Sequence, residues 1–307
     1  ILDLALLKEG YDAGDAYKRA LDVAIKAESW GFKRYWLAEH HNMPYVGSSA
    51  PTVLMGHIAQ GTKTIRVGSG GIMLPNHSPM MVAEQIGTLD TLYPGRIDLG
   101  LGRAPGTDQK TAAVLRRGRM QTVQEFPQDL EELQMFFSDE NIDSAVRAFP
   151  AEGLDIPIYL LGSSMDSAFM AAKKGLPYVF ASHFAPTYFS QAATYYKQNF
   201  KPSQYNNKPY LMALGIVRGR SYPLSPPVKD MSGIWAPHEE AAIKQMTKYA
   251  FIGSFEKVKA GLENFIEQYD LDEVMVTTNI YEHEKRLKSF KYTSEALKAL
   301  SKQSQYE

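Results

Sequence analysis

Short apolar runs alternate along this chain with longer segments in which apolar residues recur every three to four positions. The first pattern is typical of buried strands and the second of helices with one buried face. Strands are predicted at residues 1–7, 34–38, 65–67, 96–101, 156–161, 177–181, 209–215 and 271–278. Helices are predicted at residues 15–30, 51–61, 80–92, 127–140, 167–174, 186–200, 254–266 and 282–300.

This alternation places the chain in the α/β class and predicts a (β/α)8 TIM barrel. A doubly wound sheet would also alternate strands with helices, but about eight repeats in 307 residues favour the barrel. We expect residues 1–307 to form a single domain.

Polar or glycine-containing loops follow directly after four of the predicted strands. Glu39 follows the second strand, Gly70 the third, Arg103 the fourth and Ser163 the fifth. The carboxyl ends of the strands in a parallel barrel lie on one face, which carries the active site. These loops are therefore expected to meet at the barrel mouth.

Two of these loops predict a phosphate-binding site. The serines around the first turn of the helix after the fifth strand are Ser163, Ser164 and Ser167. A helix N-terminus offers free N–H groups and a partial positive charge, and a guanidinium such as that of Arg103 can bind phosphate through two hydrogen bonds. The alternative is that Ser164 only caps its helix and that Arg103 pairs with an acid such as Asp98 or Asp108.

Histidines at the expected mouth are candidates for acid–base chemistry. His40 and His41 follow the second strand beside Glu39, and near neutral pH each could act as an acid, a base or a hydrogen-bond donor. A structural hydrogen bond is the alternative for either ring. The pair is not an HExxH motif and adjacent side chains point apart, so no metal site is predicted. No pattern assigns a role to His77 or His183.

Net charge, cysteine content and the length of apolar runs limit which kinds of molecule the protein is expected to bind and where it is expected to be found. The formal net charge of −1 gives no general attraction to nucleic acid or to anionic membranes, which favours a small-molecule substrate. The chain has no cysteine, so it has neither disulfides nor a thiolate nucleophile, as is common in the cytoplasm. No run approaches the roughly 18 apolar residues of a membrane span. We expect a soluble cytoplasmic protein.

Four segments together resemble the bacterial luciferase-like flavin monooxygenases. They are YWLAEHHN, TIRVGSGGIMLP, VAEQIGTLDTLYPGRIDLGLGRAPGTD and LGSSMDSAFMAAKKGLP, in the family's order. The shorter segments AFP, FASHFAP, GIVRGR and IYEHEKRLKSF bring the resemblance closest to the alkanal-monooxygenase-like branch. The resemblance implies a TIM barrel that binds reduced FMN, supplied by a separate flavin reductase, and uses O2 to oxidise a small organic substrate. It also implies a homodimer.

The same resemblance implies roles for individual residues. His40 matches the histidine that the luciferase chemistry needs, and Arg103 matches an arginine on the FMN phosphate. Ser164 and Ser167 match two hydroxyl residues at that phosphate, and Ser163 stands where luciferase has a glutamate. The resemblance places a non-prolyl cis peptide under the flavin at Gly70–Gly71. Gly102 replaces the reactive cysteine of luciferase, which argues against assuming light emission or a long-chain aldehyde substrate.

Two other functions remain open from the sequence. Related barrels bind the deazaflavin F420, so an F420-dependent oxidoreductase is the alternative within the same class. A flavin-binding protein without turnover is the alternative from a different class, because the motifs bear more clearly on cofactor than on substrate.

The region after the sixth helix does not fit the barrel pattern well. Pro209 and Tyr210 look like the start of a seventh strand, whereas LMALGIVRGR from Leu211 resembles what the family carries after a later helix. Residues 215–237 then show no periodic pattern of apolar residues. A stretch of more than about 20 residues without periodicity is uncommon in a compact domain. We therefore expect a segment to be missing from the sequence between Tyr210 and Leu211. The alternative is a shortened seventh βα unit.

Overall fold

A computed structural model describes residues 1–116, 122–182, 186–215, 224–228 and 247–303. His183 lies outside the described residues. Within them the strands, in chain order, are β1 Leu2–Asp3, β2 Arg34–Leu37, β3 Arg66–Ser69, β4 Ile72–Met73, β5 Ile97–Gly102, β6 Ile158–Gly162, β7 Tyr178–Phe180, β8 Leu211–Gly215 and β9 Glu273–Val276.

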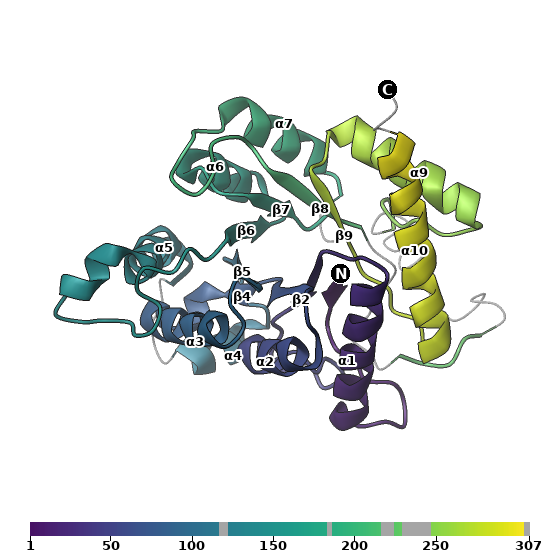
Figure 1. The fold of residues 1–307 in the computed structure, drawn as a ribbon, viewed down its shortest axis with the longest axis horizontal. Coiled ribbons are helices and arrows are strands. Elements are labelled where there is room, and N and C mark those ends of the chain that lie inside the picture. The colour runs from purple at the N-terminus through teal and green to yellow at the C-terminus, as the bar shows by residue number, and fades with distance from the viewer. Residues whose placement is uncertain (117–121, 183–185, 216–223, 229–246, 304–307) are drawn as a thin grey trace.

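The helices that connect these strands surround the sheet (Figure 1). They are α1 Ala13–Ser29, α2 Pro51–Gly61, α3 Pro79–Leu92, α4 Gln109–Arg116, α5 Thr122–Phe137, α6 Met165–Lys174, α7 Phe189–Asn199, α9 Phe255–Tyr269 and α10 His283–Gln303. Two 3-10 helices, η1 Leu74–Asn76 and η2 Asp139–Asp143, lie in the loops.

The predicted TIM barrel is confirmed. Neighbouring strands pair in parallel in the order β1-β2-β3-β5-β6-β7-β8-β9, and β4 pairs with β5 beside this path. The sheet forms a nearly closed barrel. Because neighbouring strands on this path run parallel, their carboxyl ends share one face.

Some predicted boundaries are wrong for local reasons. Asp12, not Asp15, caps α1, because its side chain accepts the Asp15 backbone N–H at 2.9 Å, and Asp15 instead forms an ion pair with Arg19. Helix α5 begins before Pro127 and contains it. Pro127 is the sixth residue of α5, so its missing N–H leaves the Val123 carbonyl without its usual helical partner, and the proline does not mark the start of the helix.

The seventh barrel strand is β8, which begins at Leu211. It pairs with β7 on one side, where Tyr178 lies opposite Leu211, and with β9 on the other. The Tyr210 carbonyl accepts the Tyr178 backbone N–H at 2.9 Å. Tyr210 and Leu211, between which a missing segment is expected, therefore both pair with β7 of the barrel. A strand in the region of residues 209–215 is thus confirmed, and the expected missing segment stays a prediction.

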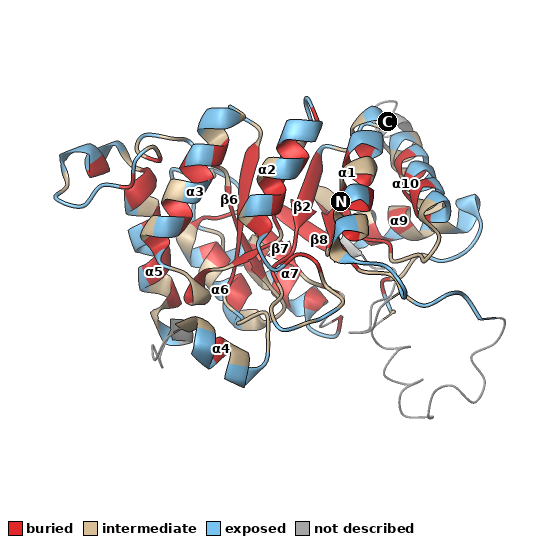
Figure 2. Cartoon of the chain, turned by 90° about the horizontal axis from the view of Figure 1, so that it is seen from below, coloured by how far each residue is buried: buried red, intermediate tan, exposed pale blue. Residues whose placement is uncertain are grey.

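The core has two layers, one between the sheet and the helices and one inside the barrel. Figure 2 shows strands almost wholly buried, and helices that turn their buried residues toward them. The inner cluster consists of Leu2, Trp36, Ala38, Tyr159, Leu161, Val179, Met212 and Met275. Burying apolar area at about 25 cal/mol per Å² makes these layers the main source of stability.

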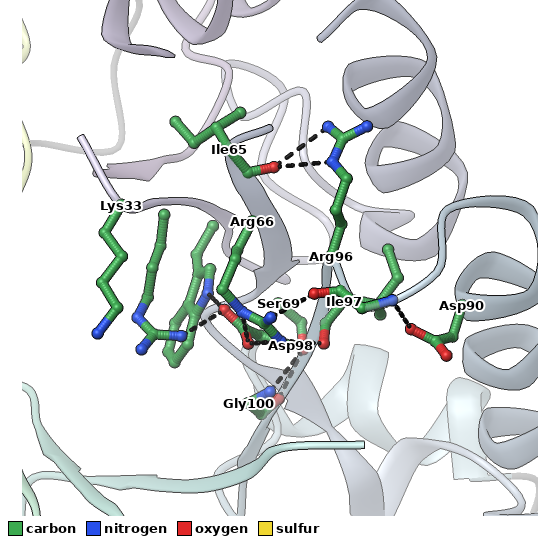
Figure 3. A network of polar contacts seen from close by, with 12 residues as sticks. Lys33, Ile65, Arg66, Ser69, Asp90, Arg96, Ile97, Asp98 and Gly100 are labelled. Carbon is green, nitrogen blue, oxygen red and sulfur yellow. Dashed lines mark hydrogen bonds and ion pairs between the residues drawn. The ribbon is translucent and has the colours of Figure 1, made fainter. Parts of the chain in front are cut away.

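A buried ion-pair network lies below this inner cluster, toward the amino ends of the strands. Asp98 is fully buried and accepts hydrogen bonds from Arg34 at 2.8 Å, Trp36 at 3.0 Å and Arg66 at 2.8 Å (Figure 3). Arg34 also pairs with Glu273 on β9 at 2.9 Å. The network therefore joins β2, β3, β5 and β9 at the end opposite the candidate site.

A candidate cofactor site at the barrel mouth

The four loops predicted to meet at the mouth do follow strands of one parallel barrel. Glu39 and His40 come after β2, Gly70 directly after β3, Arg103 directly after β5 and Ser163 directly after β6. Because these strands are parallel neighbours, all four loops lie on the same face. The predicted location of the site is therefore supported by the fold.

The backbone at Gly70 and Gly71 leaves no room for side chains. Their peptide bond is cis, as the resemblance implied. A Cβ atom on Gly71 would lie 2.7 Å from the Gly100 carbonyl oxygen, and one on Gly70 would lie 2.6 Å from a Leu2 methyl carbon. Such contacts are too short for real atoms, so bare backbone lies here at the end of β3.

His40 is held by a backbone carbonyl from a neighbouring loop. Its Nδ1 lies 3.2 Å from the Gly106 carbonyl oxygen, and since a carbonyl only accepts, Nδ1 carries the hydrogen. Nε2 of the neutral ring is then an acceptor. Burial lowers the pKa of His40, although the Gly106 hydrogen bond and the charge of Glu39 oppose this. The ring is therefore neutral at pH 7 and can take up a proton at Nε2.

Glu39 connects His41 with His77, two histidines for which no definite role is predicted from the sequence. Glu39 is fully buried, and its Oε1 accepts hydrogen bonds from Nε2 of His41 and of His77, each at 2.8 Å. Its Oε2 accepts the Met73 backbone N–H at 3.0 Å. Burial alone would raise the pKa of Glu39, but these bonds and the charge of His77 lower it to about 2.

Arg103 lies against the first turn of α6. Its guanidinium forms an ion pair with Asp166 at 3.3 Å, in which both side chains are partly exposed. The acids suggested from the sequence as its partners are wrong, because Asp98 is bound by Arg34 and Arg66, and Asp108 bonds Asn42 and Thr111. Arg103 therefore lies close to the start of α6, as predicted.

The serines form a capping box at this start. The Ser164 side chain accepts the Ser167 backbone N–H, and the Ser167 hydroxyl accepts the Ser164 backbone N–H in return. The Ser167 hydroxyl also lies 2.8 Å from the Tyr178 hydroxyl. A Cβ atom on Gly162 would lie 2.1 Å from that Ser167 oxygen, so glycine is required beside the cap. Ser164 therefore does cap its helix, which does not exclude a second role.

This arrangement has the features of a site for a phosphate group and a flat ring system. Arg103 and the N-terminal turn of α6 supply a cation and N–H donors suited to a phosphate dianion. The partly exposed Ser163 precedes the cap. The glycine backbone after β3 supplies a surface without side chains, which suits close approach of a flat ring.

Other candidate sites do not coincide with this one. Within the part of the chain that the structure describes, no group of three His, Asp or Glu residues could hold a metal ion. A cavity of about 340 Å³ lies between α9 and α10, and one of about 180 Å³ lies beside Tyr159 and Tyr210. Neither is lined by His40 or Arg103. None of the described helices is long and apolar enough to cross a membrane.

Comparison with known proteins finds similarity to one family. The profile of the luciferase-like monooxygenase family matches residues 2–291. A Bacillus subtilis protein, YvbT, is 46% identical over 323 residues, with 97% of this chain and 96% of YvbT covered. A luciferase-like monooxygenase of Escherichia coli K12 is 45% identical over 314 residues, with 94% of each chain covered.

Solved structures agree on the fold. Apo-MsnO8 superposes with a TM-score of 0.85 at 27% identity over 97% of both chains. A type II Baeyer–Villiger monooxygenase from Pseudomonas putida in complex with FMN has a TM-score of 0.71 at 15% identity, covering 96% of this chain and 95% of its own. An F420-dependent secondary alcohol dehydrogenase has a TM-score of 0.65 at 16% identity, covering 92% and 94%. The last two likenesses show the fold alone.

Proposed function

The chain belongs to the luciferase-like monooxygenase family, and on that premise we propose that it uses reduced FMN and O2 to oxidise a small organic substrate. The observation that carries the proposal is the position of Arg103 at the capped start of α6, beside a mouth that also contains His40 and the Gly70–Gly71 backbone. A cation, helix N–H donors and a glycine surface are what a flavin mononucleotide requires.

The proposal gives each residue a role at the mouth. Arg103, Ser163, Ser164 and Ser167 hold the phosphate, with the last two acting mainly by shaping the helix start. Gly70 and Gly71 lie under the ring system. His40 faces the reaction with Nε2 as the acceptor, because Nδ1 donates to Gly106. A neutral imidazole in this tautomer can take a proton from the reacting centre and return it later.

Bound reduced FMN would supply two electrons to O2, of which one atom enters the substrate and the other leaves as water. The barrel contributes a mouth above an interior filled with apolar side chains, which favours exclusion of water from below. We propose that a separate flavin reductase provides the reduced cofactor, and that the protein acts as a homodimer.

The test is transfer of labelled oxygen. The purified protein is mixed with photoreduced FMN and ¹⁸O2 in the presence of a panel of small thioethers, ketones and aldehydes, and products are examined by mass spectrometry. The proposal predicts ¹⁸O in a product, with at least about a hundredfold less in His40→Ala although this variant still binds FMN.

Each alternative function predicts a different outcome, in this experiment or in the same assay repeated with reduced F420. A flavin-binding protein without turnover would bind FMN and transfer no label to any member of the panel. An F420-dependent oxidoreductase would bind reduced F420 in preference to FMN and reduce its substrate without O2. This alternative is retained because an F420-dependent alcohol dehydrogenase shares the fold.

A further inference from the structure

Glu39 is a buried carboxylate whose hydrogen-bond donors come from two different loops of the mouth. One oxygen accepts from His41, in the loop after β2, and from His77, which follows η1, both at 2.8 Å. The other oxygen accepts the Met73 backbone N–H at the end of β4. The side chain therefore spans the gap between the loop after β2 and the β4–η1 segment.

Burying a carboxylate is costly unless its lone pairs are satisfied. The partners that the structure gives Glu39 are two imidazoles and one backbone amide. An ionised carboxylate only accepts, so Nε2 of both rings must carry a hydrogen. Loss of any donor would leave a buried charge less well compensated, which makes this carboxylate a strong constraint on both loops.

The loop that carries His40 is also tied to the loop after β5. The Gly106 carbonyl oxygen lies 3.2 Å from Nδ1 of His40 and accepts the His41 backbone N–H at 3.2 Å. The Thr107 hydroxyl donates to the His41 carbonyl oxygen at 2.8 Å. Glu39 thus completes a set of bonds in which three mouth loops fix the backbone on both sides of His40.

Resting on the proposed function, we propose that Glu39 is the positioning residue of the mouth. Through one oxygen shared by His41 and His77 it joins the loop that carries His40 to the segment Met73–His77, and it directly precedes His40 in the chain. Glu39 itself does not need to touch substrate or cofactor for this role.

Removal of the Glu39 charge should change the pKa of His40 in one direction. The groups that act on the His40 ring are Glu39 and the Gly106 carbonyl, which favour the protonated ring, and His41, which opposes it. The groups that face the Glu39 carboxylate are His41, His77 and the Met73 amide. Removing the Glu39 charge removes a stabilisation of protonated His40, so the ring should lose its proton at lower pH.

The test uses Glu39→Gln, which keeps the shape and one acceptor oxygen but removes the charge. The matched control is Glu84→Gln on α3, which removes a carboxylate elsewhere. Histidine ring resonances are followed by NMR as a function of pH, with His40 assigned by its loss in His40→Ala. We expect the midpoint of the His40 titration to move to lower pH in Glu39→Gln and to stay at the wild-type value in Glu84→Gln.

A second variant separates the joining of the loops from the charge. His77→Ala leaves Glu39 charged but removes one donor from the shared oxygen. We expect amide hydrogen exchange in residues 73–77 to become about tenfold faster in both His77→Ala and Glu39→Gln, since each loses part of one charge-assisted bond. Only Glu39→Gln should lower the His40 midpoint. The double variant should exchange no faster than the faster single one, because both act on one set of bonds.

The inference is overturned if folded Glu39→Gln keeps the wild-type His40 midpoint, or if His77→Ala leaves exchange in residues 73–77 at the Glu84→Gln value. Should Glu39→Gln fail to fold, His77→Ala still decides the joining of the loops. Both measurements use the protein without flavin. They can therefore succeed while oxygen transfer fails, or fail while it succeeds, so the two proposals are judged separately.

Discussion

At the scale of single residues, the chemistry depends on which groups the barrel brings next to a side chain. The sequence identified His40 and Arg103 as candidates because each follows a strand that ends at the mouth. It could not supply their partners, since Gly106 reaches His40 from another loop and Asp166 reaches Arg103 from the first turn of α6. The role of His77 became apparent only through its bond to Glu39, which lies 38 residues away in the chain.

His40 gives a prediction of pH dependence. Burial lowers its pKa below the ordinary value of 6.5, so the unfolded chain takes up this proton at higher pH than the folded one. The neutral ring therefore contributes to stability above about pH 6.5, and this contribution is lost as pH falls through that value and then through the lower folded-state pKa. Oxygen transfer that needs a neutral ring should have its acidic limb below pH 6.5 as well.

The measurement is urea unfolding between pH 7.5 and 5.0 for the wild type, His40→Gln and the control His57→Gln, whose histidine is exposed on α2. The free energy of unfolding should fall less with acidification in His40→Gln than in the other two proteins. Equal slopes for all three proteins would show that the buried ring is not linked to folding.

At the scale of elements, the start of α6 is where local structure and function coincide. From the sequence, a cap at Ser164 was the alternative to phosphate binding, and the structure shows that cap, with Ser167 closing the box from the third helical position and contacting Tyr178. Elements such as β4 and η1 are two and three residues long, too short for any periodicity to show. Helix α4 was missed because only one of its eight residues, Ala112, is buried.

The cap predicts a linked loss of stability and cofactor affinity. Ser164→Ala should cost about 1 kcal/mol of stability, and Ser167→Ala about 1–2 kcal/mol, because the second change also removes a buried hydroxyl partner of Tyr178. Both should weaken FMN binding severalfold, by loosening the N–H donors. Ser254→Ala at the start of α9 is the control, since it should lower thermal stability with no change in FMN affinity. Unchanged affinity in both α6 variants would remove this helix start from the proposed site.

At the scale of the whole molecule, about eight alternations of strand and helix were enough to predict the barrel and the face that carries its loops. The filled interior explains why, since apolar residues inside the barrel leave only the loops at its ends free for polar chemistry. The ion pairs around Asp98 were not predictable, because they join four strands whose neighbours only the closed sheet defines.

The quaternary structure is a prediction that rests on the resemblance. Sedimentation velocity at micromolar concentration should give about twice the chain mass of 34.4 kDa. A single species of the monomer mass would contradict it.

The junction at Tyr210 and Leu211 gives a further prediction. The alignment with YvbT extends over 323 residues, more than the 307 of this chain, so that relative has residues without a counterpart here. We propose that the protein made from its own gene carries extra residues between Tyr210 and Leu211, and peptide mapping should find them. A fragment spectrum in which Leu211 directly follows Tyr210 would establish a shortened βα unit instead.

The most direct test of the proposed function is a comparison of FMN with riboflavin, which differs from it by the phosphate alone. Fluorescence titration of the wild type should show FMN bound about thirtyfold more tightly than riboflavin, the effect of about 2 kcal/mol from a charge-assisted phosphate contact. Arg103→Ala should remove most of this difference and leave riboflavin affinity unchanged, whereas Arg147→Ala, which breaks an ion pair with Glu152, should preserve it. Equal affinity of the wild type for the two flavins, or an undiminished preference for FMN in Arg103→Ala, would contradict a flavin phosphate held between Arg103 and α6.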